Sequence, residues 1–362
     1  MDKSHDMPEK QIWELYYRHT PRILRSMDLC RGEEDFRKVY IADDGKKKLV
    51  IKYASNAFTD GERIGGWARL IHEYNKLGIY CPQIVPNKNH ELAHHFIRDG
   101  RDYYVFAEEF AKYDTAVQRD IPHLKDAWGK PSYIDDVLRS VGKVAAMHFD
   151  FLSFPSGYCL LEPHSPSDTA DEGTECALLF RDYVKEKLPA YYPQVEKLLE
   201  LFFINQEALR RVYPSLPVSC FQADLNDSNL LLDSKNQFVG LIDFNLSGKE
   251  PVLNYTVRTA LWKIHDRRLS DENNGDSKTY WYHKEMDDLR IQLFLQNIRC
   301  IEEYYPYSET EREAFPILFR YMNSFWWQHT REIKRIQGND DKIHRLLAWL
   351  EHQMTRDDIR LP

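Results

Sequence analysis

A chain of 362 residues is long enough for two domains or for two lobes of one unit. Hydrophobic residues make up 43% of the chain and charged residues 29%, which supplies a folded core and excludes a wholly disordered protein. The formal net charge of −8 has the opposite sign to that of a protein that coats nucleic acid, so we expect no nucleic-acid partner.

The N-terminal residues and the cysteines both bear on the compartment. The first six residues, MDKSHD, are polar and charged, and no apolar segment of the signal-peptide type follows them. The apolar run at 198–204 contains Glu200 and is too short to cross a bilayer. The six cysteines are scattered without a CxxC pair, which favours reduced core thiols over a disulfide scaffold. We therefore expect a cytoplasmic protein with no membrane partner.

The first 110 residues are predicted to form a small α+β unit. Alternating and β-branched runs predict five strands, at residues 22–29, 36–42, 48–54, 91–97 and 102–109. Apolar residues spaced three and four apart predict two helices, over residues 8–19 and 59–77. Gly78 should end the second helix, because a glycine just beyond the last turn is a common stop signal.

After residue 110 the pattern becomes mainly helical. We expect helices at residues 133–151, 178–186, 194–212, 287–304, 309–337 and 341–355. Thr310 and Glu313 have the spacing of a capping box at the start of the fifth of these helices. Residues 154–174 and 270–277 are rich in polar and turn-forming types, so we expect loops there.

The segment 220–245 interrupts this helical pattern and carries the residues best suited to chemistry. An apolar run leads into a polar loop that contains Asp224 and Asn229. A turn at 234–237 then leads to a second apolar strand that ends just before Asp243. A hairpin brings the start of one strand next to the end of the other, so these two carboxylates and one amide should converge. Such oxygens suit Mg²⁺, although Asp and Asn are also common turn formers and the loop alone is a weak signal.

The pattern Asp-x-x-x-x-Asn, followed by a strand and Ile-Asp-Phe, resembles the catalytic segment of the aminoglycoside phosphotransferase and choline kinase group. That group belongs to the protein-kinase-like fold and usually has His-Gly before the aspartate, where this chain has Gln222 and Ala223. The resemblance covers about residues 22–260. It implies an α+β, two-lobe fold with a small antiparallel-sheet N-lobe containing one helix, at 1–110. A mainly helical C-lobe, at 111–362, would carry the catalytic loop and the acceptor pocket.

The resemblance also implies roles for residues of the small lobe. Leu49-Val50-Ile51-Lys52 resembles the strand whose lysine holds the α- and β-phosphates of ATP or GTP. Glu62 is the expected partner of Lys52, with Glu73 as the alternative. Residues 32–35, with one glycine, fall where a loop covers the phosphates. The carbonyl of Glu108 and the amide of Phe110 would face the adenine.

The implied function is the transfer of a phosphoryl group from ATP or GTP to a hydroxyl of a small molecule. Asn229 and Asp243 would hold Mg²⁺, and Asp224 would accept a hydrogen bond from the acceptor hydroxyl. A catalytically weak or silent nucleotide-binding protein is the alternative, which Gln222 and Ala223 suggest. A protein kinase is disfavoured because no Ala-Pro-Glu follows Asp243.

The acceptor and the oligomeric state are less determined. Aromatic rings and carboxylates after residue 243 would favour a cationic acceptor, such as an aminoglycoside or an amino alcohol. A core of packed aromatic residues explains the same pattern equally well. The residues concerned are Tyr255, Trp262, Tyr280, Trp281, Tyr321, Trp326, Trp327, Asp287 and Asp288. The sequence leaves the oligomeric state unknown.

Overall fold

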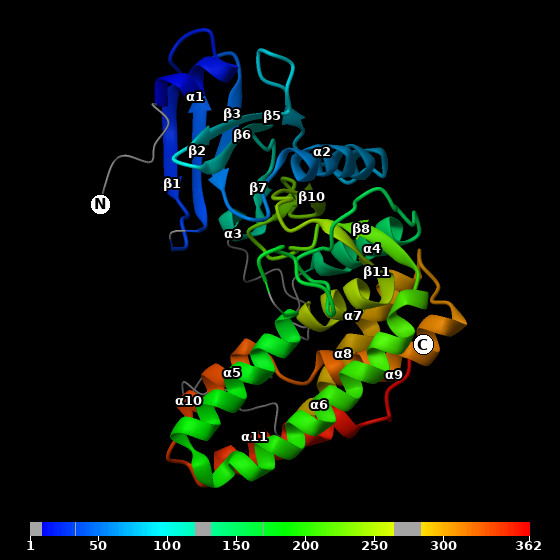
Figure 1. Cartoon of the computed structure of the whole chain (residues 1–362). Helices are drawn as coiled ribbons and strands as arrows, with labels where there is room; N and C mark the ends of the chain where they lie inside the picture. The colour runs from blue at the N-terminus through cyan, green and yellow to red at the C-terminus, as the bar shows by residue number, and fades with distance from the viewer. Residues whose placement is uncertain (1–8, 33, 120–131, 169, 264–283) are drawn as a thin grey trace.

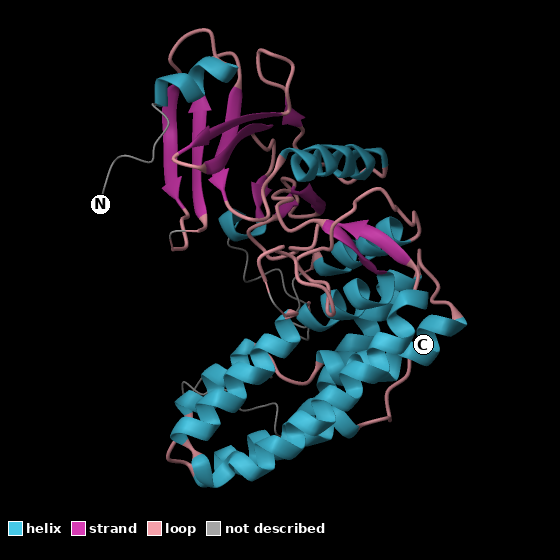
Figure 2. Cartoon of the chain, in the orientation of Figure 1, coloured by secondary structure: helices cyan, strands magenta, loops and turns pink. Residues whose placement is uncertain are grey.

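The computed structural model describes residues 9–32, 34–119, 132–168, 170–263 and 284–362. An antiparallel sheet with one long helix lies at one end of the molecule, and a large group of helices lies at the other (Figures 1 and 2). Small β-elements occupy the region between these two parts. This arrangement confirms the expected α+β class, with a sheet-rich N-terminal region and a mainly helical C-terminal part.

The N-terminal sheet has the strand order β1-β2-β3-β6-β4, and β5 also pairs with β6. Its strands are β1 (Arg22–Asp28), β2 (Phe36–Asp43), β3 (Lys48–Ser55), β4 (Ile84–Val85), β5 (Ala93–Arg98) and β6 (Arg101–Glu109). All five predicted strands are present, and β4 is an addition of two residues that the sequence pattern is too short to reveal. β4 and β5 lie end to end along the same edge of β6.

The two faces of this sheet have different neighbours. Side chains alternate between the faces of a strand, so the residues before and after Lys52 lie on one face and Lys52 lies on the other. The first face, with Ile51 and Val105, is buried with residues of helix α1 (Glu9–Tyr16). Lys52 and its direct cross-strand partner Phe106 point to the opposite face, where Phe106 joins the core that continues into the helical part.

Helix α2 (Gly61–Lys76) connects the sheet to that larger core. Asp60 caps its first turn by accepting a hydrogen bond from the Arg63 amide at 2.8 Å. Its buried face includes Trp67, whose ring lies 5.9 Å from that of Phe106. Gly78, with a φ of +78°, follows the helix as expected.

Two short sheets, one of which contains the β9–β10 hairpin, lie between the N-terminal sheet and the helices (Figure 2). β9 (Leu230–Leu232) pairs with β10 (Phe238–Leu241) and with β7 (Asp114–Thr115), while β8 (Val218–Phe221) pairs with β11 (Gly248–Pro251). Tyr80 and Gly240 form a bridge here, and a Cβ on Gly240 would stand 1.8 Å from the Tyr80 carbonyl oxygen. Glycine is therefore required for this close approach.

The helices of the C-terminal part are α3 (Ala116–Arg119), α4 (Ile134–Ala145), α5 (Glu172–Lys187), α6 (Tyr192–Val212), α7 (Val252–Trp262), α8 (Lys284–Glu302), α9 (Glu309–Met322), α10 (Trp327–Arg335) and α11 (Asp340–Thr355). Several differ from prediction. The helix expected over 133–151 ends at Ala145, and His148 just beyond it has a φ of +47°, outside the helical region. The helix expected over 309–337 is two helices, and Asn323 caps the first with a non-helical conformation.

The capping box also lies elsewhere than predicted. It consists of Ser308 and Glu311, because the helix begins two residues earlier than the Thr310 pairing requires. No helix among the described residues has the length and apolar character needed to cross a membrane. The cysteines all lie in the described part of the chain, and none of the six forms a disulfide there.

Candidate active site

The loop between β8 and β9 presents Asp224 and folds back on itself through Asn229. The Asn229 side chain donates from Nδ2 to the Asp224 carbonyl at 3.0 Å and to Asp224 Oδ2 at 2.8 Å. Asn226 Nδ2 donates to Asp224 Oδ1 at 2.8 Å. Burial raises the pKa of Asp224, and these donors oppose the shift because they favour the ionised carboxylate.

The hairpin brings Asn229 and Asp243 together, as the sequence predicts. Leu230 and Leu241 are direct partners in the ladder, and the Ile242 amide donates to the Asn229 carbonyl at 3.0 Å. Asp243 follows directly and has a φ of +63°. A positive φ is costly for a residue other than glycine, and such strain is often kept at functional sites.

Lys52 reaches this carboxylate from the N-terminal sheet. Its Nζ atom lies 3.0 Å from Asp243 Oδ1 and 2.8 Å from Glu108 Oε1. Burial by itself lowers the pKa of Lys52, but the two carboxylates outweigh burial and raise it, so the ammonium stays charged. Burial raises the pKa of Glu108, and the Lys52 charge opposes that shift.

The expected pairing of Lys52 with Glu62 is therefore wrong. Glu62 Oε1 accepts a hydrogen bond from Ser153 Oγ at 2.5 Å, in the segment before α5. The alternative, Glu73, pairs with Lys76 at 2.9 Å on its own helix. Glu108 takes the role instead because it lies two residues beyond Phe106 on β6, on the same face as Lys52.

The expected adenine contacts of Glu108 and Phe110 also need correction. The Phe110 amide donates to the Lys48 carbonyl at 3.2 Å, so it is already used within the sheet. In an antiparallel ladder, every second pair of opposite residues is hydrogen-bonded. Lys48 and Phe110 form such a pair, so the next one, two residues along, is Val50 with Glu108. The Glu108 carbonyl is then also engaged by its neighbouring strand.

Gln222 connects the Asp224 loop to the Asp243 turn. Its side chain is fully buried, and its Nε2 donates to the carbonyls of Ile242 at 3.0 Å and Asp243 at 2.5 Å. Its Oε1 accepts from the Asp224 amide at 2.7 Å. Ala223 has a φ of +67°, a conformation that explains why the resembling group has glycine at this position. The side-chain amide of Gln222 therefore holds the Asp224 loop and the Asp243 turn together.

The side-chain oxygens of Asn229 and Asp243 suit a hard divalent cation. Because the Asn229 Nδ2 atom is turned towards Asp224, its Oδ1 atom faces away from that carboxylate. The Asp243 carboxylate keeps one oxygen beyond the Lys52 contact and lines the cleft. One amide oxygen and one carboxylate are a sparse set, which fits Mg²⁺ because that ion keeps several waters and binds phosphates. Among the described residues, no cluster of three or more His, Cys, Asp or Glu residues forms a metal site.

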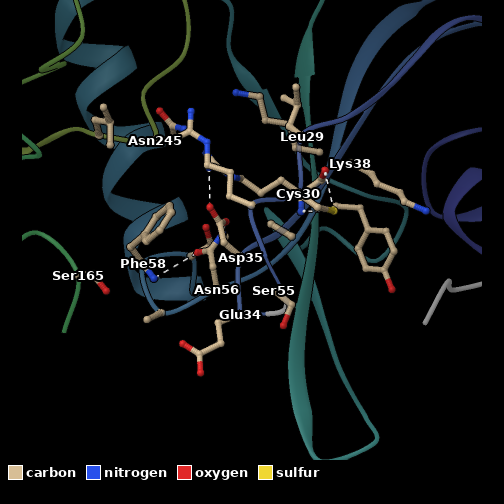
Figure 3. Close-up of a pocket in the computed structure, with 18 of the residues that line it drawn as sticks. Leu29, Cys30, Glu34, Asp35, Lys38, Ser55, Asn56, Phe58, Ser165 and Asn245 are labelled. Atoms are coloured by element: carbon tan, nitrogen blue, oxygen red, sulfur yellow. Dashed lines mark hydrogen bonds and ion pairs between the residues drawn. The ribbon is translucent and has the colours of Figure 1, made fainter. Parts of the chain in front are cut away.

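A cleft of about 1380 Å³ opens beside these groups. Lys52, Asp224 and Asp243 line it together with the turn after β1 and the turn after β3, parts of which Figure 3 shows. Asp35 links the two turns, because it accepts a hydrogen bond from Asn56 Nδ2 at 3.2 Å. It also accepts one from Arg37 Nη2, on β2, at 2.6 Å. The predicted phosphate-covering loop at 32–35 therefore borders the cleft, although Glu33 lies outside the described residues.

The aromatic residues expected near an acceptor have mixed positions. Tyr255 and Tyr321 are buried in the core, and Tyr280 and Trp281 lie outside the described residues. The rings of Tyr158, Trp262 and Trp326 face the guanidinium of Arg258, at 4.3, 5.5 and 4.6 Å from ring centroid to Cζ. A cation of the chain itself therefore occupies these ring faces.

The two acidic residues expected near the acceptor, Asp287 and Asp288, differ in their surroundings. Asp287 is buried and pairs with Arg356 Nη1 at 2.9 Å, so this carboxylate belongs to a structural ion pair. Asp288 is exposed on α8. Glu172, which the sequence did not single out, pairs with Arg258 Nη2 at 2.9 Å and is 45% exposed. Its carboxylate therefore belongs to an ion pair with the same arginine that the aromatic rings face.

Comparison with solved structures defines the class of fold. The chain has the protein-kinase-like fold found in small-molecule kinases, which confirms the resemblance at the level of fold. It is similar to amicoumacin kinase in complex with AMP-PNP, Ca²⁺ and Ami, with a TM-score of 0.53 and 13% identity over 96% of this chain and 92% of that chain.

Two further structures are more distant. A microcompartment-associated aminopropanol kinase has a TM-score of 0.48 and 12% identity, covering 96% of this chain and 94% of that one. An aminoglycoside phosphotransferase from Alicyclobacillus acidocaldarius has a TM-score of 0.45 and 13% identity, covering 98% of each chain. No family model matches the sequence, and no curated protein matches it.

Proposed function

We propose that this protein transfers a phosphoryl group from ATP or GTP to a hydroxyl group of a small molecule. Residues 1–110 would form the nucleotide-binding lobe, and residues 111–362 would carry the catalytic loop and the acceptor pocket. The observation that carries the proposal is the 3.0 Å contact between Lys52 Nζ, from the N-terminal sheet, and Asp243 Oδ1, from the turn after β10. Asp224 and Asn229 lie together on the loop before β9. The Asn229 carbonyl joins this loop to the Asp243 turn by accepting a hydrogen bond from the Ile242 amide.

Phosphoryl transfer needs positioning and electrostatic stabilisation more than covalent chemistry from the protein. Lys52 would bind the α- and β-phosphates, with Glu108 holding its ammonium in place. Asn229 and Asp243 would hold Mg²⁺, which neutralises charge on the phosphates when it is bound. Asp224 would accept a hydrogen bond from the acceptor hydroxyl and orient its oxygen for attack. The nucleobase would contact the chain beyond Phe110, because the Glu108 carbonyl and the Phe110 amide are already bonded within the sheet.

The alternative is a silent nucleotide-binding protein, and the geometry around Gln222 disfavours it. This residue keeps the Asp224 amide and the Asp243 carbonyl bonded to one side chain. The loop is therefore held in place although His-Gly is replaced. All four side chains that the proposed reaction needs are present. Three of them, Lys52, Asp224 and Asp243, line the cleft, and Asn229 is hydrogen-bonded to Asp224.

The decisive experiment screens hydroxyl compounds for acceptor-dependent ADP or GDP release with Mg²⁺. Asp224→Asn is the matched variant, because asparagine fills the same space but accepts the hydroxyl proton poorly. It should bind nucleotide normally and lose on the order of 10²–10⁴ in kcat. Nucleotide binding without transfer to any acceptor class would favour the silent protein. Normal turnover in Asp224→Asn would remove Asp224 from the mechanism.

The proposed acceptor is cationic, and acidic side chains that line the cleft, such as Glu34 and Asp168, support this choice. The aromatic rings around Arg258 do not distinguish the charge of an acceptor, since this arginine already occupies their faces. Rates for matched charged and neutral acceptors should be compared over a salt series. A cationic acceptor held by these carboxylates should lose kcat/KM as salt rises, because salt screens charges beyond about 8 Å at physiological ionic strength. A faster and salt-insensitive neutral acceptor would overturn the cationic choice alone.

A further inference from the structure

Tyr158, which belongs to none of the motifs, contacts the carboxylate of Asp224. Its hydroxyl donates to Asp224 Oδ1 at 3.2 Å. Tyr158 lies in the long connection between α4 and α5, 66 residues away from Asp224 in sequence, and its side chain is almost fully buried. Nothing in the local sequence predicts this contact.

The position of Tyr158 is fixed on every side. Its amide donates to Ser156 Oγ at 3.0 Å, and its carbonyl accepts from Asn254 Nδ2 at 2.9 Å and from Arg258 Nη1 at 2.8 Å. Its ring lies 4.3 Å from the Arg258 guanidinium and 4.9 Å from the ring of Trp262. Residues of α7, among them the buried Asn254 and Arg258, therefore hold both its backbone and its ring.

The other donors to Asp224 differ from Tyr158 in one respect. Asn226 and Asn229 belong to the same loop as Asp224, so they would move with the carboxylate if the loop shifted. Tyr158 belongs to a separate segment and ties the carboxylate to the helical core. Burial and the nearby Asp224 charge raise the pKa of Tyr158, so its hydroxyl stays protonated and donates at neutral pH.

We propose that Tyr158 is a positioning residue that fixes the orientation of the Asp224 carboxylate for the acceptor hydroxyl, a role that rests on the proposed function of Asp224. Two donors occupy Oδ1 and one occupies Oδ2, which leaves the acceptor a defined direction of approach to the carboxylate. A carboxylate free to rotate would present its lone pair to the acceptor for a smaller fraction of the time.

The first test measures hydrolysis of MgATP, with water as the hydroxyl acceptor. Tyr158→Phe should lower kcat about 10-fold and leave the KM for MgATP unchanged, since the lost bond orients the acceptor side alone. The matched control is Tyr305→Phe. Tyr305 is also buried and also donates to a carboxylate, Glu311 Oε1, at 2.9 Å, but it lies in the helical core. This control should lose stability and keep wild-type kcat. An equal fall of kcat in both variants would overturn the proposal.

The second test does not depend on activity. The midpoint of urea unfolding is measured for the wild type, Tyr158→Phe, Asp224→Ala and the double variant. Tyr158→Phe should lower the midpoint in the wild-type background and change it much less in the Asp224→Ala background, because its partner is then absent. Equal shifts in both backgrounds would show that the hydroxyl does not act on Asp224. If the wild type neither binds nor hydrolyses MgATP, the proposed function fails, while this cycle still decides the contact.

Discussion

The Lys52 ammonium is held by a glutamate of its own sheet, Glu108, at 2.8 Å, and not by a glutamate of helix α2. Both side chains lie on the same face of the sheet and are largely buried, and Lys52 lines the cleft. The orientation of the lysine is therefore built into the β3–β6 ladder. Movement of α2 does not break this pair.

This pairing predicts opposite outcomes for two glutamates. Glu108→Gln should lower the rate of phosphoryl transfer about 10-fold, equivalent to ~1.4 kcal/mol, because the neutral amide holds the ammonium less firmly. Glu62→Gln is the control and should keep the wild-type rate, since Glu62 contacts Ser153. Steady-state ADP release measures both. A rate loss in Glu62→Gln alone would return the pairing role to α2.

The second prediction concerns the metal that we propose Asp243 holds. MgATP should raise the unfolding midpoint of the wild type, by about 2.7 kcal/mol in free energy at a ligand concentration of 100 times Kd. Asp243→Ala should lose the part of this shift that depends on Mg²⁺. Asp150→Ala is the control, because Asp150 forms a similar pair with Lys249 at 2.8 Å on the surface. A Mg²⁺-dependent shift that survives in Asp243→Ala would contradict the metal assignment.

The third prediction concerns Gln222. Gln222→Leu keeps the side-chain volume but leaves the Ile242 and Asp243 carbonyls and the Asp224 amide without this partner. We expect a loss of about 1–3 kcal/mol in the free energy of unfolding, the usual cost of burying an unpaired polar group. Turnover should fall as well, since the two halves of the site lose their connection. Urea unfolding and ADP release measure the two effects, and unchanged values for both would contradict the bridging role.

The fourth prediction concerns Glu250, which accepts hydrogen bonds from Ser156 and Asn254 in the buried network behind Tyr158. Burial raises the pKa of Glu250 to about 7 from its ordinary value of 4.5. Between pH 4.5 and pH 7, Glu250 holds its proton in the folded protein and has lost it in the unfolded chain. The free energy of unfolding therefore falls as pH rises through this range. The loss from this group reaches about 3 kcal/mol and levels off above pH 7.

Urea unfolding between pH 5 and pH 8 measures this dependence. Glu250→Gln has no proton to lose, so the difference in stability between the wild type and this variant should change with pH over the same range. A constant difference would mean that Glu250 titrates at its ordinary pKa in the folded protein.

Local sequence alone determined the five longer strands of the N-terminal sheet, the start and end of α2 and the hairpin that joins Asn229 to Asp243. These features depend on side-chain alternation, helical spacing and turn residues, which act over a few residues. The spacing of Asp224, Asn229 and Asp243 predicts their meeting for the same reason, since one loop and one hairpin contain all three residues.

The tertiary structure decided which distant side chains complete the site. The partner of Lys52 depends on the register of β3 against β6, which places Glu108 on the same face as the lysine across more than 50 residues of chain. The contact of Tyr158 with Asp224 depends on how the irregular segment after α4 packs on α7. Such a segment has no periodicity from which its packing can be predicted. Its hydrogen-bond partners are chosen by burial, because a buried polar group must find a partner wherever the fold brings one near.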